Sequence, residues 1–427
     1  MKKAVIGSSL LVGGLVLSGC SFSSESSSGG EGEQINLDIF QGKVEVNEQF
    51  EELAAQYEEE NPNVNVEVTS VGGGSDYQGS LKSKFSSGDE PAIFNIAGPT
   101  EAEQFSQYLA DLSDMESAET ALEGTLDPMK EDGNVHGLPV NQEGYGFIYN
   151  KNVFEEAGIN AEDIQTYEDL EQAVQTLDEQ KEELGIEEVF AYPAKEVWVA
   201  GNHLSNTFLS PEFDQNVTEA YNAESVEFNK GEEFKRILDL QTDYSIQPTL
   251  SLDYSQQVEE YFSQQQVAII QQGNWVYPSV EQLDPEFAES GMGIMPIPVE
   301  GYEGQLPVDV PNYWAVNNNK DEETVQAAKD FLDWLNTSEA GKEAIMTEFN
   351  YIPAYEGYDT EQIADPLSKE IYEYSSNDNT IGWVFLGYPN GWGDSLGASV
   401  QKYLSGDLEW NQLEKNMKKE WEESRSE

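Results

Sequence analysis

The chain of 427 residues carries 82 Asp and Glu against 21 Lys and Arg, a formal net charge of −61. This charge repels nucleic-acid backbones and anionic lipid head groups, which excludes nucleic-acid binding. Aromatic residues make up 11% of the chain, so we expect a folded protein with a solvated acidic surface rather than a disordered acidic chain.

The first residues have the layout of a secretory signal. Lys2 and Lys3 precede an apolar run over residues 4–17, which is too short to cross a bilayer. Leu17-Ser-Gly-Cys20 then resembles a bacterial lipobox, in which Cys20 becomes the lipid-modified first residue of the mature chain. We therefore expect a lipoprotein signal peptide over 1–20, followed by a flexible Ser/Gly/Glu tether over 21–34. Cys20 is the only cysteine, so no disulfide is expected.

The next segment alternates predicted strands and helices. Apolar alternation predicts strands, and apolar residues at helical spacing predict helices. The expected order is strand 35–40, helix 46–60, strand 64–68, helix 77–86 and strand 92–97. A β-α-β-α-β order implies a parallel sheet, and ligands of such sheets bind beyond the carboxyl ends of the strands. The loops at 41–43, 72–77 and 98–100 should therefore line one edge of a cleft.

A second α/β unit follows the short strand 137–140. Strands are expected at 146–150, 189–192, 226–228, 267–271, 293–297 and 314–317. Helices are expected at 152–157, 166–184, 232–241, 256–265, 320–335, 395–404 and 410–422. We find no internal repeat at a fixed period.

Several segments of these two units carry a family resemblance. They are Val135-His-Gly-Leu-Pro-Val140, the run from Gly146 to Phe154, Thr166-Tyr-Glu-Asp-Leu170, the run from Phe262 to Trp275, and the helix from Ala328 to Leu335. In this order they resemble the extracellular solute-binding proteins of sugar ABC transporters, of which the maltose-binding protein is one. The lipoprotein members of that family are anchored mainly on the outer face of Gram-positive cells.

The resemblance implies a two-lobed α/β fold with a hinge and an interlobe cleft. Lobe one should comprise 35–140 plus 308–347, and lobe two 141–307 plus 348–427. It also implies a monomer that captures a carbohydrate, a disaccharide or oligosaccharide, and delivers it to the permease subunits of the membrane. No cofactor, metal or catalytic activity is implied.

Candidate ligand residues follow from the chemistry of sugars. A sugar ring offers an apolar face for aromatic stacking and a rim of hydroxyls for planar polar groups. Four tryptophans lie in loops or beside glycines, where the alternative is a cap on the hydrophobic core: Trp198, Trp275, Trp383 and Trp392. The family resemblance points most strongly to Trp275 as a stacking residue, and also to Trp392. Trp334, Trp410 and Trp421 lie on predicted helices and should be packing residues.

Polar and further aromatic candidates surround the predicted cleft. Gln41 and Lys43 lie in the first strand–helix loop, and Asp76 lies in the second. Glu143, with Tyr145 beside it, lies in a crossing segment where the maltose-binding relative offers an acidic sugar ligand; it could equally be one more surface acid. Tyr313 and Trp314 lie near the second crossing, and either could face the cleft.

Other function classes remain open. A secreted glycoside hydrolase would also use Trp platforms and carboxylates, but the order of motifs does not support one. The two histidines, His136 and His203, stand in no catalytic motif. A receptor for another solute such as a peptide, or one that feeds a sensor kinase, is the alternative within the binding class.

Overall fold

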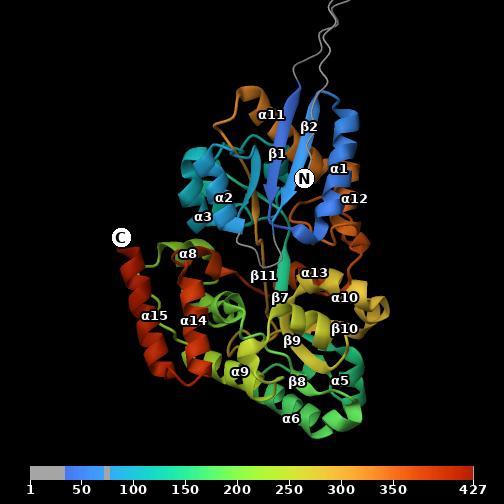
Figure 1. Cartoon of the computed structure of the whole chain (residues 1–427), viewed down its shortest axis with the longest axis vertical. Coiled ribbons are helices and arrows are strands. Elements are labelled where there is room, and N and C mark those ends of the chain that lie inside the picture. The colour runs from blue at the N-terminus through green and yellow to red at the C-terminus, as the bar shows by residue number, and fades with distance from the viewer. Residues whose placement is uncertain (1–33, 72–76, 427) are drawn as a thin grey trace, which may run out of the picture.

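The computed structural model describes residues 34–71 and 77–426, which form two lobes stacked along the long axis of the molecule (Figure 1). The signal segment, Cys20 and Asp76 lie outside the described residues. Within the described stretches, no helix has both the length and the apolar character needed to cross a membrane.

The first lobe is built on a five-stranded sheet of order β2-β1-β3-β12-β6. β1 pairs in parallel with β2 and β3, as the β-α-β-α-β order predicts, whereas β12 is antiparallel to both β3 and β6. The strands are β1 (Ile35–Gln41), β2 (Val64–Ser70), β3 (Ile93–Ile96), β6 (Leu138–Pro139) and β12 (Tyr313–Val316). A small hairpin, β4 (Lys130–Glu131) and β5 (Asn134–Val135), lies beside it.

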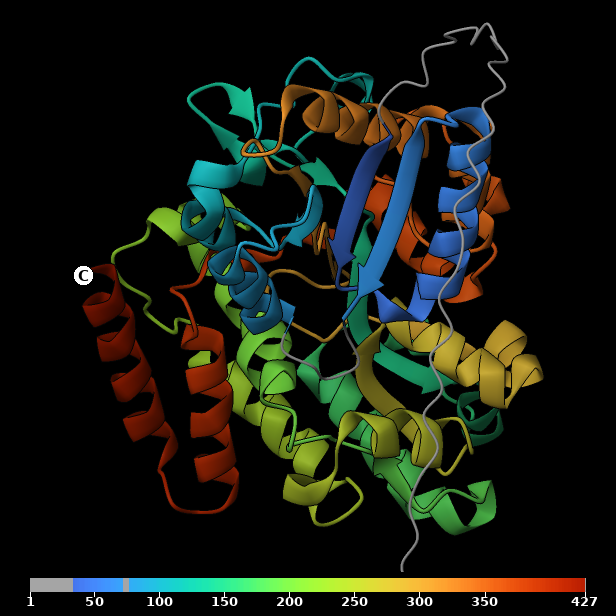
Figure 2. The same cartoon turned by 45° about the horizontal axis from the view of Figure 1, so that its top comes forward.

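Helices cover both faces of this first sheet. Alternation along β1 sends Leu37 and Ile39 into one core with α1, α11 and α12, while Phe40 enters a second core with α2 and α3. Figures 1 and 2 accordingly show α1 and the pair α2–α3 on opposite sides of β1 and β2. The helices are α1 (Asn47–Glu60), α2 (Tyr77–Ser87), α3 (Pro99–Phe105), α4 (Glu116–Thr120), α11 (Glu322–Thr337) and α12 (Glu339–Thr347).

The second lobe is built on a six-stranded sheet around β7 (Glu143–Asn150). Its main path is β13-β11-β7-β9-β8, and β10 also pairs with β7. Because the sheet is covered on both faces, most residues of its strands are buried, including seven of the eight residues of β7. The other strands are β8 (Glu188–Phe190), β9 (Val267–Gly273), β10 (Met292–Met295), β11 (Leu306–Asp309) and β13 (Thr380–Ile381).

The helices of the second lobe start and stop at recognisable residues. α6, for example, begins with a capping box between Thr166 and Asp169 and ends at Gly185, whose φ of 72° suits glycine. The helices are α5 (Lys151–Ala157), α6 (Tyr167–Leu184), α7 (Ser205–Leu209), α8 (Val217–Asn222), α9 (Gly231–Asp243), α10 (Tyr277–Leu283), α13 (Pro366–Ser376), α14 (Trp392–Leu404) and α15 (Trp410–Arg425). Short 3₁₀ and π-helical segments that matter below are η5 (Val199–Leu204), η9 (Asn274–Val276) and η12 (Val384–Gly387).

Three segments cross between the lobes and are hydrogen-bonded to one another. Val140 N donates to Asn312 O at 2.9 Å, and Gln142 N donates to Ile352 O at 2.8 Å. The crossings between β6 and β7, between β11 and β12, and after α12 therefore meet in one hinge.

Two sequence expectations differ from the structure. Val308, where we began the second part of lobe one, lies in β11 and pairs with Gly144 in the second sheet. The expected boundary was wrong because β11 and β12, the two short strands on either side of Pro311, are both largely apolar. Their apolar pattern does not indicate which sheet each strand joins. The expected strand at 226–228 is irregular, because Phe228 adopts a positive φ of 51° that an extended strand does not allow.

Candidate functional site

The loop after β1 is held rigidly at the hinge side of the first lobe. Gln41 is buried, and its amide nitrogen donates to Lys43 O at 3.0 Å and to Ser70 Oγ at 2.6 Å. The Gln41 amide oxygen accepts from Lys43 N at 3.1 Å. Asn95, at the end of β3, accepts from Gly42 N at 3.0 Å. The hydrogen bonds of the buried Gln41 side chain thus fix the conformation of this loop.

The same loop reaches across to the second lobe through an ion pair. Lys43 Nζ contacts Glu143 Oε1, and the two side chains are only 13% and 7% exposed. Asn141 Nδ2 also donates to that carboxylate oxygen, at 3.2 Å. The structure therefore brings together two of the polar residues that the sequence singled out, one from each lobe.

A cluster of aromatic rings, hereafter the aromatic cluster, lies in the second lobe next to this ion pair. Its centre is His203, and its other members come from β7, η9, the segment around η5 and the segment around η12. The centroid distances from His203 are 4.4 Å to Tyr145, 5.0 Å to Trp198, 5.1 Å to Trp275, 5.3 Å to Phe385 and 5.7 Å to Trp383.

The members of the aromatic cluster differ in exposure. Tyr145 and Trp383 are buried, whereas Trp198, His203, Trp275 and Phe385 are half-buried. The half-buried rings can contact a solute. The two buried rings, Tyr145 and Trp383, pack against His203. Predicted candidates Tyr145, Trp198, Trp275 and Trp383 thus meet in one place.

Trp275 owes its position to the residues just before it. Its indole N–H donates to Gln272 Oε1 at 2.8 Å, which fixes the plane of the ring. A Cβ on Gly273 would come within 2.2 Å of the Trp275 ring and 2.4 Å of Gly144 O. Only glycine fits there, which explains why a Gly precedes the Trp in this motif.

His203 is neutral at physiological pH. Burial among the aromatic rings lowers its pKa to about 3, because desolvation disfavours the charged imidazolium. Its backbone oxygen accepts from Tyr145 Oη at 2.8 Å, which ties η5 to β7. The imidazole therefore serves the cluster as a planar ring and not as a cation.

A pocket of about 420 Å³, hereafter the interlobe pocket, adjoins the aromatic cluster through Phe385. The first lobe contributes the start of α2 and the turn into α3, and the second lobe contributes η5, η12 and the start of α14. Lining residues that bear on its chemistry are Tyr77, Gln78, Glu101, Asn202, Asn390 and Asp394.

The walls of the interlobe pocket are fixed by internal bonds. Tyr77 Oη donates to Phe40 O at 3.0 Å and accepts from Asn95 N at 2.9 Å. Glu101 Oε2 accepts from Ala97 N at 2.9 Å, and burial raises the pKa of this carboxyl to about 7.

Three predicted candidates lie in hydrophobic cores instead of on the cleft surface. Trp392 is 1% exposed and donates its indole N–H to Met417 O at 2.9 Å. Trp314 packs against Phe50 in the core of the first lobe, with ring centroids 5.7 Å apart. Tyr313 is fully buried in the other core of that lobe. In each case tertiary packing buries a ring whose exposure the sequence alone did not determine.

The sequence did not single out Phe385, Asn202 or Asp394 as site residues. It considered His203 only as a catalytic residue, and it placed Tyr77 in a loop expected to line the cleft. Asn202 and His203 lie four and five residues after the candidate Trp198. Asp394 lies two residues after the candidate Trp392 at the start of α14. The sequence does not single it out, because acidic residues occur throughout the chain.

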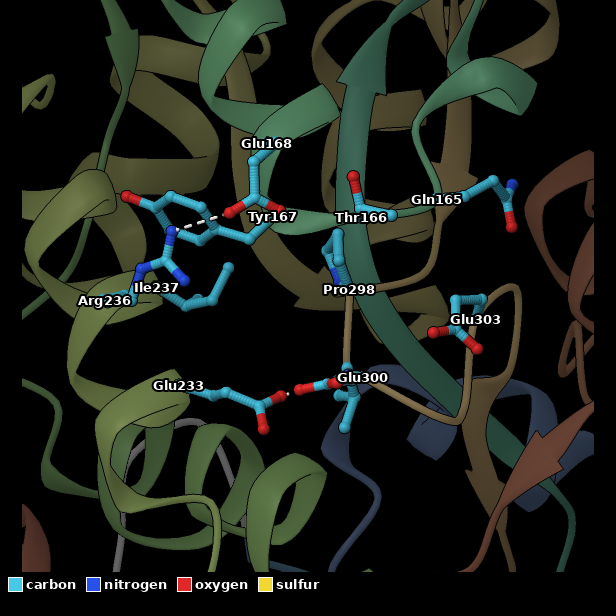
Figure 3. A pocket seen from close by; sticks show the side chains of 11 residues that line it. Gln165, Thr166, Tyr167, Glu168, Glu233, Arg236, Ile237, Pro298, Glu300 and Glu303 are labelled. Carbon is cyan, nitrogen blue, oxygen red and sulfur yellow. Dashed lines mark hydrogen bonds and ion pairs between the residues drawn. The ribbon is translucent and has the colours of Figure 1, made fainter.

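A pocket of similar volume, about 420 Å³, lies on one side of the second lobe (Figure 3). There the Arg236 guanidinium lies 3.7 Å over the Tyr167 ring and bonds Glu168 at 3.0 Å. All its lining residues come from the second lobe, so it does not belong to the interlobe site. In the described part of the chain, no group of three or more His, Cys, Asp or Glu is arranged to hold a metal ion.

Comparison with known proteins identifies the family. Over 376 residues the chain is 24% identical to the melibiose/raffinose/stachyose-binding protein MelE of Bacillus subtilis, covering 84% of this chain and 82% of that protein. Among solved structures, a chitin oligosaccharide binding protein superposes with a TM-score of 0.77 at 21% identity, covering 93% of this chain and 100% of that one. RafE in complex with raffinose superposes with a TM-score of 0.74 at 18% identity, covering 92% and 100%. These likenesses confirm the predicted two-lobed fold. Residues 43–342 match the model of the bacterial extracellular solute-binding proteins, a family of binding proteins and not of enzymes, and the chain belongs to this family.

Proposed function

We propose that this protein is the substrate-binding component of an ABC importer and that it binds a carbohydrate between its lobes. The observation that carries the proposal is the aromatic cluster, whose half-buried rings Trp198, Trp275 and Phe385 surround His203. Its member Tyr145 lies two residues after Glu143 in β7. Stacking rings next to planar polar groups are what a sugar needs from a receptor.

The charge of the site favours a neutral ligand. Lys43 is paired with Glu143, and the interlobe pocket presents Glu101 and Asp394 without a Lys or Arg among its lining residues. A uronate or sugar phosphate would meet like charges there. Relatives named for melibiose, raffinose, stachyose and chitin oligosaccharides support a neutral disaccharide or oligosaccharide.

Two further elements of the proposal concern the surroundings of the protein. We propose that Cys20 carries a lipid that anchors a monomer to the outer face of a Gram-positive-type membrane, where the permease subunits accept the sugar. Replacing Cys20 by Ser should release the protein into the medium of an expressing Gram-positive host. Retention of C20S on the membrane would contradict the anchor.

A thermal-shift screen tests the ligand class. Purified protein is heated with melibiose, raffinose, stachyose, maltotriose, sorbitol, a tetrapeptide and single amino acids. A ligand at a hundred times its Kd that binds only the folded state stabilises it by about 2.7 kcal/mol. At least one sugar should raise the Tm, and the peptide and amino acids should not. Stabilisation by the peptide alone would overturn the carbohydrate assignment. Release of shorter sugars from an oligosaccharide would indicate a hydrolase.

A further inference from the structure

The two lobes also contact each other outside the three crossing segments. α3 of the first lobe contacts α8 and η12 of the second, and Figure 1 shows α8 directly below α3. A short 3₁₀ segment of the first lobe, η3 (Asp127–Met129), contacts α8 as well. This meeting of α3 with α8 and η12, hereafter the rim contact, lies beside the interlobe pocket, to which α3 and η12 both contribute residues.

A hydrogen bond joins the lobes at the rim contact. Thr100 Oγ1, in α3, donates to Tyr388 O, just after η12, at 3.0 Å. Nearby, a Cβ on Gly98 would come within 3.1 Å of the Leu386 Cβ, so the missing side chain lets the two lobes approach closely. Thr100 and Tyr388 line the interlobe pocket from opposite lobes. Opening the cleft therefore breaks this bond.

Opposite charges face each other across the same contact. Burial raises the pKa of the Tyr221 hydroxyl in α8, and the nearby Glu103 carboxylate of α3 raises it further, whereas Arg425 lowers it. The Arg425 guanidinium lies 5.4 Å from the centre of the Tyr221 ring. Tyr221 thus lies between an acid of the first lobe and a base of the second, and these charges attract each other when the lobes are together.

Arg425, near the end of α15, holds together the two elements of the second lobe that α3 contacts. Its Nη2 donates to Ala220 O in α8 at 3.1 Å and to Gly387 O in η12 at 2.6 Å. A Cβ on Gly387 would come within 2.3 Å of Val217 O, so only glycine lets η12 pack this closely on α8. One side chain therefore fixes α8 and η12 as a single surface for α3.

The rest of that surface is also rigid. The Tyr388 side chain is buried against Trp392 and Trp421, with ring centroids 4.9 Å and 5.4 Å away. The Trp421 indole N–H donates to Ala223 O, just after α8, at 2.9 Å. The carbonyl that accepts from Thr100 is thus held in place by the second lobe before the lobes meet.

We propose that the rim contact is a latch that favours the closed arrangement of the lobes, and that Arg425 is a positioning residue for it. The bonds of the rim contact join protein atoms only, so the latch acts on the ligand-free protein and on every ligand alike. A ligand that binds only the closed form loses apparent affinity in proportion to the fraction of closed protein that is lost. The proposal does not require the ligand to be a sugar.

Interlobe distances in the ligand-free protein test the latch. Nitroxide labels are placed on Ser83→Cys in α2 and Lys402→Cys in α14, two exposed positions on opposite lobes, in a Cys20→Ser background. Pulsed electron paramagnetic resonance should show a short and a long distance. Thr100→Val removes the bond to Tyr388 and should lower the ratio of short to long distances about fivefold, as loss of one hydrogen bond implies.

Two variants control for the change at Thr100. Thr100→Ser keeps the hydroxyl and should retain the short distance. Thr347→Val removes a hydroxyl that donates to Glu343 O within α12, at an exposed position of the same lobe, and should leave the distances unchanged.

A double-mutant cycle tests the positioning role of Arg425. Arg425→Met should lower the ratio of short to long distances in the same direction as Thr100→Val. In the Thr100→Val background it should change that ratio little further, because the bond it positions is already gone, while its effect on the Tm should persist. Arg236→Met, at the only other Arg, lies away from the rim contact and should not change the distances.

The outcomes bear separately on each proposal. A single long distance in the ligand-free protein, or distances unchanged in both Thr100→Val and Arg425→Met, would overturn the latch. Fully additive effects of the two substitutions on the distances would overturn the positioning role of Arg425. If raffinose and stachyose bind, their affinity should fall in Thr100→Val by the same factor for both. Failure of every sugar to bind folded protein would overturn the proposed function and leave the distance measurement valid.

Discussion

Removal of the Trp275 side chain tests whether the aromatic cluster binds ligand. The ring is half-buried, and its closest aromatic neighbours are His203 at 5.1 Å and Trp198 at 6.4 Å. If a sugar stacks on it, Trp275→Ala should cost about 1–3 kcal/mol of binding free energy, by analogy with stacking of bases on aromatic side chains. Affinity should fall roughly ten- to a hundredfold.

The same substitution should cost less folding stability than loss of a core tryptophan. A fully buried Trp→Ala change costs about 3–5 kcal/mol. Trp275 is only partly buried, so we expect about 2 kcal/mol, part of it because Gln272 Oε1 loses its donor. Trp275→Phe keeps a stacking ring and should retain most of the affinity.

Trp334 provides a matched control in the first lobe. It is partly buried against Tyr57 and Phe331, and its indole N–H bonds Glu60 at 3.1 Å. Trp334→Ala should lower the Tm and leave sugar affinity unchanged. Calorimetry and thermal denaturation on both variants decide the question. Unchanged affinity in Trp275→Ala, together with a fall in Tm like that of a core variant, would show that Trp275 only packs.

Three further predictions concern the hinge, the pH response and the salt response. Lys43→Met should lower the Tm more than the double variant Lys43→Met/Glu143→Gln does, because the single change leaves the buried Glu143 carboxylate without its ion pair; additive losses would contradict this. The pKa of His203 is about 3 in the folded chain, against an ordinary value of 6.5. Between these two values the unfolded chain binds a proton at this residue and the folded chain does not. The free energy of unfolding should therefore fall as the pH drops from about 7 towards 3. In His203→Gln the Tm should fall less between pH 7 and pH 4.5, and parallel curves would contradict the assignment. Because the net charge is −61, added NaCl should raise the Tm by screening the repulsion between like charges. Sucrose at equal osmolarity does not screen charge, so the Tm should depend differently on its concentration.

Periodicity predicted most elements of this fold because most of them bury one face. α1 was expected from Phe50, Leu53, Ala54 and Tyr57, and these are its buried residues. The β-α-β-α-β start fixed a parallel pairing of β1 with its neighbours before any contact was known. Strand partners far along the chain could not be found this way. β12 joins the first sheet and β11 the second, although only three residues separate them.

The site was harder to predict because exposure of an aromatic ring is a tertiary property. Gly273 lies two residues before Trp275, and Gly391 and Gly393 flank Trp392 in the sequence. The ring of Trp275 is held half out of the surface by Gly273 and Gln272, whereas Trp392 is covered by Tyr388 and Trp421, which comes from the next helix. The residues around Trp392 do not show that Trp421, which comes from the next helix, covers its ring.

Most of the acidity of the chain lies on its surface. Among residues 34–71 and 77–426, the buried carboxylates are Glu143 and Asp365. Glu143 is ion-paired with Lys43. Asp365 caps α13 by accepting from Leu367 N at 2.8 Å, and burial raises its pKa to about 7. Burial also raises the pKa of the Glu101 and Asp309 carboxyls. Most of the other described acidic residues are at least partly exposed, and there a negative charge costs little and keeps the protein soluble. A strongly acidic chain can therefore still present a candidate site of aromatic rings, amides and only a few carboxylates, and we expect this local chemistry, more than the net charge, to select the ligand.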